Sequence, residues 1–366
     1  MNHLVLLGGG EAHLFVLDAI RRGRLKGADV TLIAPATPEP WPPMLAGVVS
    51  GRYRIEESLP DAGSLAAAAG VRRVIGDPVG LDAASRTIRV TGADPVTWDI
   101  LSIATRAEPA SGPVAALPAS PASRAAEIPE RIESVVRGAG ALSVVVVGGG
   151  LRGVELACAI RQRLGGMNRG FGDRVTLVER GEQVLPEFSP AASRAVERVL
   201  VRQRIGIATG TEAVGGGDGK LQFDHGGSTR ADVVVWAAGA TAPRWLAESG
   251  LETDERGFVV TDAGLRSVSH PTVFASGGAG RIREGEMADR RTRPARRDAT
   301  ALLRGIAAGL RGDFTSMHRP TRPVATFVDT SDGRALVFGK NLAVHSTAAL
   351  YLKERRDREL ILRLRA

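Results

Sequence analysis

Cysteine is nearly absent from this chain of 366 residues, which contains Cys158 alone. An intramolecular redox disulfide needs two cysteines, so dithiol–disulfide chemistry within the chain is excluded. Because Cys158 lies in a stretch of small residues expected to be helical, we interpret it as a packed, unreactive side chain. The six histidines are scattered without the spacing of metal ligands, and we expect no metal site.

Long apolar runs are missing as well. No run approaches the ~18 residues of a membrane-spanning helix. The apolar start at residues 4–7 is too short for a signal peptide. These absences predict a cytoplasmic location.

Lysine is scarce too, occurring at only four positions, so arginine carries almost all of the net charge of +8. The basic residues gather at 281–297 and at 353–365, where they could meet an anionic membrane surface or a polyanion. We do not expect nucleic-acid binding, because neither stretch interleaves aromatic residues or matches a known module.

Glycine and valine are abundant between residues 144 and 160, which read VVVVGGGLRGVELACAI. Four consecutive valines are typical of a buried parallel strand, and the residues after the glycines have the apolar spacing of a helix. Gly148, Gly150 and Gly153 stand at G-x-G-x-x-G spacing between strand and helix. In a dinucleotide-binding turn these glycines allow the bend, the approach of a pyrophosphate and the packing of helix on strand. The helix N-terminus would attract the phosphates.

A carboxylate follows at the end of the next apolar run, residues 175–178. Glu179 is suited to bind the ribose hydroxyls of an adenine nucleotide, and it favours NADH over NADPH because it repels a 2′-phosphate. The neighbouring Arg180 makes this a preference only. A glycine turn that merely joins strand to helix is the alternative interpretation.

The same pattern occurs earlier in the chain, at a constant offset of 140 residues. Residues 3–20 match residues 143–160, with Gly8 and Gly10 in the places of Gly148 and Gly150. Such a repeat predicts a duplicated fold. The first copy departs from the second at three places: His13 for Gly153, Ala34 followed by Pro35 for Glu179, and Arg106 for Gly239. Either a different nucleotide binds the first copy, or that site has decayed.

The predicted fold class is therefore α/β, with two Rossmann-like dinucleotide-binding domains and a small C-terminal α+β segment. A rigid proline-rich loop at 38–43 is expected at the carboxyl end of the first sheet. The remaining expected elements are a crossing at 107–121, one helix at 122–137, an antiparallel excursion at 207–231 turning at Gly215–Gly217, a strand at 272–275, a helix at 295–310, strands at 325–328 and 335–338, and a basic helical tail.

At this level of detail the chain resembles the pyridine nucleotide-disulfide oxidoreductase superfamily of two-dinucleotide-binding-domain flavoproteins. It is most similar to type II NADH dehydrogenases and to flavoproteins fused to selenide, water dikinase. The resemblance rests on LVLLGGGEAH, PWPPMLAG, DILSIATR, VVVVGGGLRGVELA, VVVWAAGA and RGFVVTDAGLRSVSHPTVFASGG. It implies an FAD domain at 1–110 and 244–315, an inserted NAD(P) domain at 111–243 and a C-terminal interface segment at 316–366.

The resemblance also implies which residues bind the two cofactors, FAD and NADH, with NADPH less favoured. The FAD residues would be Gly8, Gly10, His13, Pro35, Met44, Thr105, Gly277 and Gly278, with Met44 near the isoalloxazine. The NADH residues would be Gly148, Gly150, Arg152, Gly153, Glu155, Glu179, Arg180 and Gly239, with Glu155 near the nicotinamide–flavin junction. No catalytic residue is assigned, because the cofactors carry the chemistry.

Two residues depart from the family pattern. Gly278 stands where the family has an aspartate that binds the ribityl chain, and Arg106 stands where it has a glycine. Losing the carboxylate would weaken FAD binding by about ten- to a hundred-fold, so a Gly278→Asp substitution is expected to raise FAD retention. A degenerate homologue that binds nucleotide or a protein partner without turnover is the alternative function.

The function implied by the resemblance is an FAD-dependent NAD(P)H oxidoreductase that passes a hydride from NADH to flavin and on to a small-molecule acceptor. A quinone is the acceptor that analogy suggests. Disulfide reductases and sulfide:quinone oxidoreductases are set aside because Cys158 has no partner cysteine. A peripheral contact with the inner face of the membrane through the basic C-terminus, and a homodimer, are further expectations.

Overall fold

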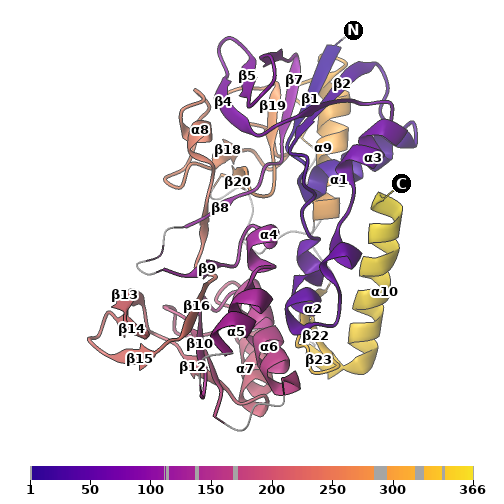
Figure 1. Cartoon of the computed structure of the whole chain (residues 1–366). Coiled ribbons are helices and arrows are strands. Elements are labelled where there is room, and N and C mark those ends of the chain that lie inside the picture. The colour runs from indigo at the N-terminus through magenta and orange to yellow at the C-terminus, as the bar shows by residue number, and fades with distance from the viewer. Residues whose placement is uncertain are drawn as a thin grey trace.

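The computed structural model describes residues 2–110, 112, 115–136, 140–167, 172–283, 295–317, 325–339 and 343–365. Within them the chain forms two Rossmann-like units, which lie one above the other in Figure 1 with a long C-terminal helix along their side. The basic stretch at 281–297 falls mostly on residues 284–294, outside the described ranges.

The first unit is built on a five-stranded parallel sheet with the order β19-β7-β1-β2-β3. Its strands are β1 (Asn2–Leu7), β2 (Ala28–Ala34), β3 (Arg72–Ile75), β7 (Ile100–Ile103) and β19 (Val273–Ala275). Because β19 comes from much later in the chain, the second unit is inserted between β7 and β19.

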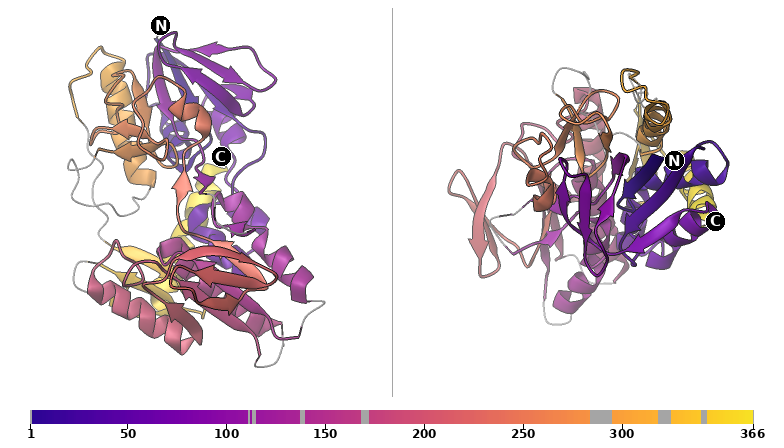
Figure 2. Two further views of the ribbon diagram at one scale, coloured as in Figure 1. Left: turned by 90° about the vertical axis from the view of Figure 1, so that its left-hand side faces the viewer. Right: turned by 90° about the horizontal axis from the view of Figure 1, so that it is seen from above.

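Side chains alternate between the two faces of this sheet. Leu4 and Leu6 of β1 pack in a core with three helices, whereas Val5 and Leu7 pack against a small antiparallel sheet on the other face. The helices are α1 (Glu11–Arg21), α3 (Ala62–Ala68) and α9 (Ala295–Gly309), and the antiparallel strands are β4 (Pro78–Asp82), β5 (Thr87–Val90) and β6 (Val96–Thr97). Figure 2 shows this layering from the side and from above.

The second unit repeats the arrangement in the order β12-β11-β10-β16-β9. Its strands are β9 (Leu117–Pro118), β10 (Ser143–Val147), β11 (Arg174–Val178), β12 (Ile205–Ala208) and β16 (Val233–Trp236). Val144 and Val146 face the helices α5 (Ile128–Val136), α6 (Leu151–Gly166) and α7 (Pro190–Arg202). Val145 and Val147 face a sheet of β13 (Ala213–Gly217), β14 (Lys220–Phe223) and β15 (Ser228–Arg230). The duplication expected from the repeat is confirmed.

Two local expectations are wrong. The helix expected at 122–137 is two helices, α4 (Ala122–Ala125) and α5. The glycines at 215–217 lie in β13, and the turn comes one step later, at Asp218 and Gly219. Both turn residues have left-handed φ values, +49° and +74°, as a two-residue hairpin turn requires.

Short elements connect the two units. Strands β8 (Glu108–Pro109) and β17 (Ala240–Thr241) pair antiparallel where the chain crosses between the units. The proline-rich loop leads into η1 (Pro42–Met44) and α2 (Leu45–Ser50), and α2 packs on α6 of the second unit. Further short elements are η2 (Ile55–Ser58), α8 (Arg244–Ala247), β18 (Val259–Thr261) and β20 (Gly280–Ile282).

The C-terminal segment bridges both units. It contains the antiparallel strands β21 (Thr326–Asp329), β22 (Ala335–Phe338) and β23 (Ala343–Ser346), followed by α10 (Thr347–Leu364). Phe338 packs edge-on against Phe188 of the second unit, whereas Ile361 and Leu364 are buried in the core of the first. None of the helices in the described ranges has the length and apolar character to cross a membrane.

Candidate functional site

Each unit carries a glycine turn between its first strand and first helix. Gly8 and Gly148 have left-handed φ values of +101° and +111°, which favour glycine. Gly10 and Gly150 then start α1 and α6 as extended N-cap residues without a side-chain cap. The first N–H groups of both helices therefore remain available to an anionic ligand.

The third position of the motif differs between the units. In the second unit, a Cβ on Gly153 would lie 1.8 Å from the carbonyl oxygen of Gly148, so α6 packs directly on the turn. In the first unit, His13 occupies this place and is fully buried. Its Nδ1 lies 2.6 Å from the carbonyl oxygen of Gly8, and its Nε2 lies 2.9 Å from Oγ of Ser102.

Burial lowers the pKa of His13 to about 4, so the imidazole is neutral at pH 7. The neutral ring donates Nδ1–H to Gly8 and accepts from the Ser102 hydroxyl. His13 does not line the cleft described below. The structure therefore places this predicted cofactor residue beneath the turn, where it supports Gly8.

Glu179 lies at the end of β11, beside the second turn. Its carboxylate accepts hydrogen bonds from the N–H of Gly149 at 2.6 Å and of Gly181 at 2.8 Å. The side chain is thereby held against the turn while 9% of the residue stays exposed. The neighbouring Arg180 is exposed, and Gly239, in the connection between β16 and β17, has a φ of +101°.

A cleft of about 2270 Å³ runs from the first turn toward the second unit. Ligand pockets commonly measure about 300–1,000 Å³, so the cleft has room for an extended dinucleotide. It is lined by predicted site residues from separate parts of the sequence: Gly8, Gly10, Pro35, Thr105, Arg152, Gly277 and Gly278. The other predicted residues of the second unit are not part of this lining.

Two buried hydroxyl groups in this cleft are suited to contact a ligand. Ser276 is 1% exposed, and neither its Oγ nor the buried Oγ1 of Thr105 has a hydrogen-bond partner among the described residues. Buried polar groups are normally hydrogen-bonded. Together with the uncapped start of α1, these two groups fit the hydroxyl and phosphate groups of a dinucleotide such as FAD.

A carboxylate also lines the cleft. Glu11 is in the first turn of α1, where the repeat places Leu151 in the second unit. Burial raises the pKa of Glu11 to about 7; Arg152 lowers it in part, and Asp298 and Asp357 raise it further. The sequence comparison could have identified this residue, because Glu11 is a further difference between the two copies at the glycine turn.

Arg106 is held above the cleft by two carboxylates. Its guanidinium forms an ion pair with Glu39 of the proline-rich loop, and Asp77 lies 3.7 Å away. The second carboxylate oxygen of Glu39 accepts from the N–H of Ser123, at the start of α4, at 3.1 Å. Arg106, Glu39 and Asp77 all line the cleft.

Gly278 corrects an expectation drawn from the family pattern. A Cβ at this position would lie 2.4 Å from the backbone nitrogen of Ala107 and 2.7 Å from the carbonyl oxygen of Thr105. The backbone at 105–107 therefore leaves no room for an aspartate. Gly278 is a packing requirement of this chain, and the expected gain in FAD retention from Gly278→Asp is not supported.

Met44 and Arg152 hold the proline-rich loop. Met44, expected near the isoalloxazine, is fully buried in the first core and does not line the cleft. Arg152, at the start of α6, lines the cleft and donates to the carbonyl oxygen of Pro42 at 3.1 Å.

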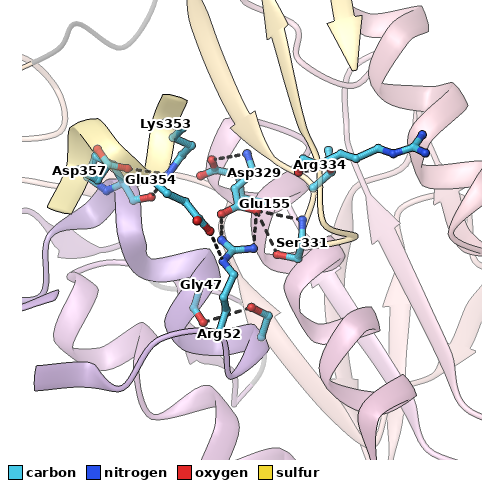
Figure 3. Close-up of polar contacts among 12 residues, drawn as sticks. Gly47, Arg52, Glu155, Asp329, Ser331, Arg334, Lys353, Glu354 and Asp357 are labelled. Atoms are coloured by element: carbon cyan, nitrogen blue, oxygen red, sulfur yellow. Dashed lines mark hydrogen bonds and ion pairs between the residues drawn. The ribbon is translucent and has the colours of Figure 1, made fainter. Parts of the chain in front are cut away.

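A second polar cluster joins α2, α6 and the C-terminal segment (Figure 3). Arg52 forms ion pairs with the buried Asp329 and, at 2.8 Å, with Glu354. Lys353 donates to the carbonyl oxygen of Pro43 and to Asp357, the latter at 2.9 Å. The cluster therefore links the loop beside the cleft to α10.

Glu155, which was expected near the nicotinamide–flavin junction, belongs to this cluster and does not line the cleft. Its Oε1 accepts from the backbone N–H of Asp329 at 3.1 Å. Burial raises the pKa of Glu155 to about 7, although Lys353 and Arg152 lower it in part. Glu155 faces the C-terminal segment because it lies one turn of α6 beyond Arg152. The sequence did not indicate that β21 would pack there.

Cys158 is fully buried, and burial raises the pKa of its thiol well above the ordinary value, as expected for an unreactive side chain. Among the described residues, no group of three or more histidine, cysteine, aspartate or glutamate side chains could hold a metal ion.

The chain matches known proteins over much of its length. The family model for pyridine nucleotide-disulphide oxidoreductases matches residues 2–292. The NADH dehydrogenase-like protein Rv1812c of Mycobacterium tuberculosis is 27% identical over 232 residues, which cover 59% of this chain and 56% of that protein. The type II NADH:quinone oxidoreductase of Haemophilus influenzae is 28% identical over 177 residues, covering 46% and 40%. The alignments thus span about half the length of these curated relatives.

A solved structure shows the same fold. The sulfide:quinone oxidoreductase of Aquifex aeolicus superposes with a TM-score of 0.85 over 100% of this chain and 92% of that chain, at 15% sequence identity. Identity this low supports the shared fold alone.

Proposed function

This chain belongs to the pyridine nucleotide-disulphide oxidoreductase family, and on that premise we propose that it is an FAD-dependent NAD(P)H oxidoreductase delivering electrons from NADH to a small-molecule acceptor. When bound, FAD and NADH would supply the redox chemistry, a hydride passing from nicotinamide to flavin and electrons onward. The chain's own residues bind and orient the two cofactors.

The first unit is proposed to hold FAD, with the FAD domain at 1–110 and 244–315 and the NAD(P) domain at 111–243. The observation that carries this assignment is the cleft at the first glycine turn, which contains the unpartnered hydroxyls of Thr105 and Ser276. Gly8 and Gly10 would bring backbone N–H groups to the diphosphate. Gly277, beside Ser276, has open space around its Cα.

The second unit is proposed to hold NADH. Gly150 has no heavy atom within 4 Å of the place where a Cβ would be, so a pyrophosphate can approach its backbone. Glu179 is held in place by two backbone N–H groups and would bind the adenosine ribose. Its negative charge favours NADH over NADPH, and the exposed Arg180 limits the size of that preference.

A quinone is the proposed acceptor. The type II NADH:quinone oxidoreductase of Haemophilus influenzae, a relative of this chain, uses an acceptor of this class. With a single buried cysteine in the chain, a dithiol relay is not available to carry the electrons.

A membrane surface is the proposed place of this reaction. The C-terminal helix exposes Tyr351, Leu352 and Leu362 and carries several arginines, a combination that suits the surface of an anionic bilayer. Co-sedimentation with anionic vesicles, lost on replacing these three residues with serine, checks this contact. A homodimer is a further proposal, and the molar mass in solution tests it.

One purification tests the proposed function. The protein should bind FAD, turn yellow, and then oxidise NADH with a dye or a short-chain quinone as acceptor. A protein that stays colourless with added FAD and does not oxidise NADH would contradict the proposal. That result would favour a nucleotide-binding homologue without turnover.

A further inference from the structure

At two positions beside the turn, the first unit has a charged residue where the second unit has an uncharged one. Glu11 corresponds to Leu151, and Arg106 corresponds to Gly239. An ionised Glu11 at the start of α1 would repel a diphosphate bound there. A cation within reach of the same place would offset that repulsion.

The backbone just before Arg106 contacts the start of α1. The N–H of Gly10 donates to the carbonyl oxygen of Ala104 at 3.0 Å, and Arg106 is two residues further along the same strand end. The side chain is 40% exposed, lines the cleft and is not packed into a core. A guanidinium can therefore reach a ligand that binds the first turn.

The present partners of Arg106 can be exchanged. Its ion pair with Glu39 is partly exposed, and such pairs contribute little to stability. Glu39 would keep its hydrogen bond from Ser123 if Arg106 left. A guanidinium binds a phosphate through parallel charge-assisted hydrogen bonds, so a diphosphate is a stronger partner than this carboxylate.

We infer that Arg106 is a binding residue for the anionic diphosphate of the dinucleotide in the first unit, and that Glu39 competes with that diphosphate for its guanidinium. This inference rests on the proposed binding of FAD there. Of the two explanations for Arg106 in place of Gly239, it favours a different nucleotide in the first copy over a decayed site.

Affinity for FAD, measured by flavin fluorescence in the apoprotein at two salt concentrations, tests the inference. Arg106→Gln should weaken binding by about ten- to a hundred-fold and reduce its dependence on salt. The FAD affinity of Arg106→Lys should fall between that of the wild type and that of Arg106→Gln. Glu39→Gln removes the competing charge but keeps an oxygen for Ser123, and it should tighten binding about two- to fivefold.

Arg355→Gln is the matched control, since Arg355 forms an exposed pair with Glu359 on α10 and does not line the cleft. It should leave FAD affinity unchanged. If the Arg106–Glu39 pair served only to tie the loop to β7, both glutamine variants would weaken binding alike, which would overturn the inference. Equal affinity of wild type and Arg106→Gln would overturn it while leaving the proposed function intact, whereas a wild type that binds no FAD would overturn both.

Discussion

The two units differ in how the first helix packs on the glycine turn that precedes it. In the second unit Gly153 lets α6 lie against the carbonyl of Gly148, where even a Cβ would come within 1.8 Å. In the first unit His13 fills the same place and donates a hydrogen bond of 2.6 Å to the carbonyl of Gly8. The comparison teaches that a missing motif glycine does not by itself indicate a decayed site.

The departures in the first unit form a connected set. His13 needs Ser102 as its second partner, and the repeat places Val235 at that position in the second unit. Gly278 accommodates the backbone at 105–107, which carries Arg106 to the cleft. These residues are consistent with a first site adapted to a different dinucleotide.

The largest expected effect comes from filling the space at Gly153. Gly153→Ala should lower the free energy of unfolding by about 3 kcal/mol, because the added methyl meets a backbone oxygen that cannot move away easily. Chemical denaturation measures this loss. An unchanged unfolding midpoint would show that α6 does not pack on the turn as described.

The mirror experiment removes the histidine from the first unit. His13→Ala should cost about 2–3 kcal/mol, since it leaves the Gly8 carbonyl and the Ser102 hydroxyl without this partner in a buried cavity. Ser102→Ala removes only one of the two contacts and should cost less. A His13→Ala protein as stable as wild type would sink the claim that this side chain supports the turn.

A third test separates the two adjacent glycines of the first unit. Gly278→Asp should destabilise the protein by about 1–3 kcal/mol and lower FAD retention, because its Cβ would meet backbone atoms. Gly277→Asp is the control for stability alone, since Gly277 lines the cleft: the space there is open, and Asp tolerates a φ of +58° better than most residues. Thermal unfolding and the bound flavin content measure both effects. Higher flavin content in Gly278→Asp would restore the expectation from the family pattern.

In the second unit, Glu179→Gln should weaken NADH binding by about tenfold and narrow the preference over NADPH. The glutamine keeps one acceptor for the backbone N–H groups but loses the charge that selects an unphosphorylated ribose. KM values for both nucleotides provide the measurement. An unaltered NADH:NADPH ratio would remove Glu179 from the nucleotide site.

The last expected effect is a pH dependence of stability, to which Glu11 of the first unit and Glu155 of the second both contribute. The pKa of Glu11 is about 7 in the folded protein against an ordinary value of 4.5, so the unfolded chain loses this proton first. The resulting stability is present below pH 4.5, declines between pH 4.5 and 7, and is absent above that range. Glu11→Leu, which copies the second unit, should remove the part of this decline that comes from Glu11 and leave the part that comes from Glu155. Glu155 is present in both the wild type and Glu11→Leu, so its contribution is the same in both. If the melting temperatures of the two proteins change in parallel from pH 4.5 to 8, the role of Glu11 is contradicted.

Sequence patterns predicted the repeated architecture well, because alternating and helical periodicities are local. The four valines of β10 and the glycine turn appear in the structure as expected. Strand β23 is not indicated by the sequence pattern, because it is only four residues long and partly exposed. The turn after β13 lies at Asp218 and Gly219, just beyond the three glycines at 215–217 where it was expected, because only the later two residues have positive φ.

The site was harder to predict, because its polar contacts join residues far apart in the chain. His13 meets Ser102 across 89 positions, and Glu155 meets Asp329 across 174. Neither partner is indicated by spacing or periodicity. Glu11 alone could have been found from the sequence, by comparing the two copies at every position of the turn.

The central claim is that the two units hold two different dinucleotides in functional contact, FAD in the first and NADH in the second. Anaerobic titration of the FAD-loaded protein with NADH tests it most directly. The account predicts that the yellow flavin absorbance bleaches with stoichiometric NADH and returns when a quinone is added. Bound flavin that keeps its colour in excess NADH would contradict it.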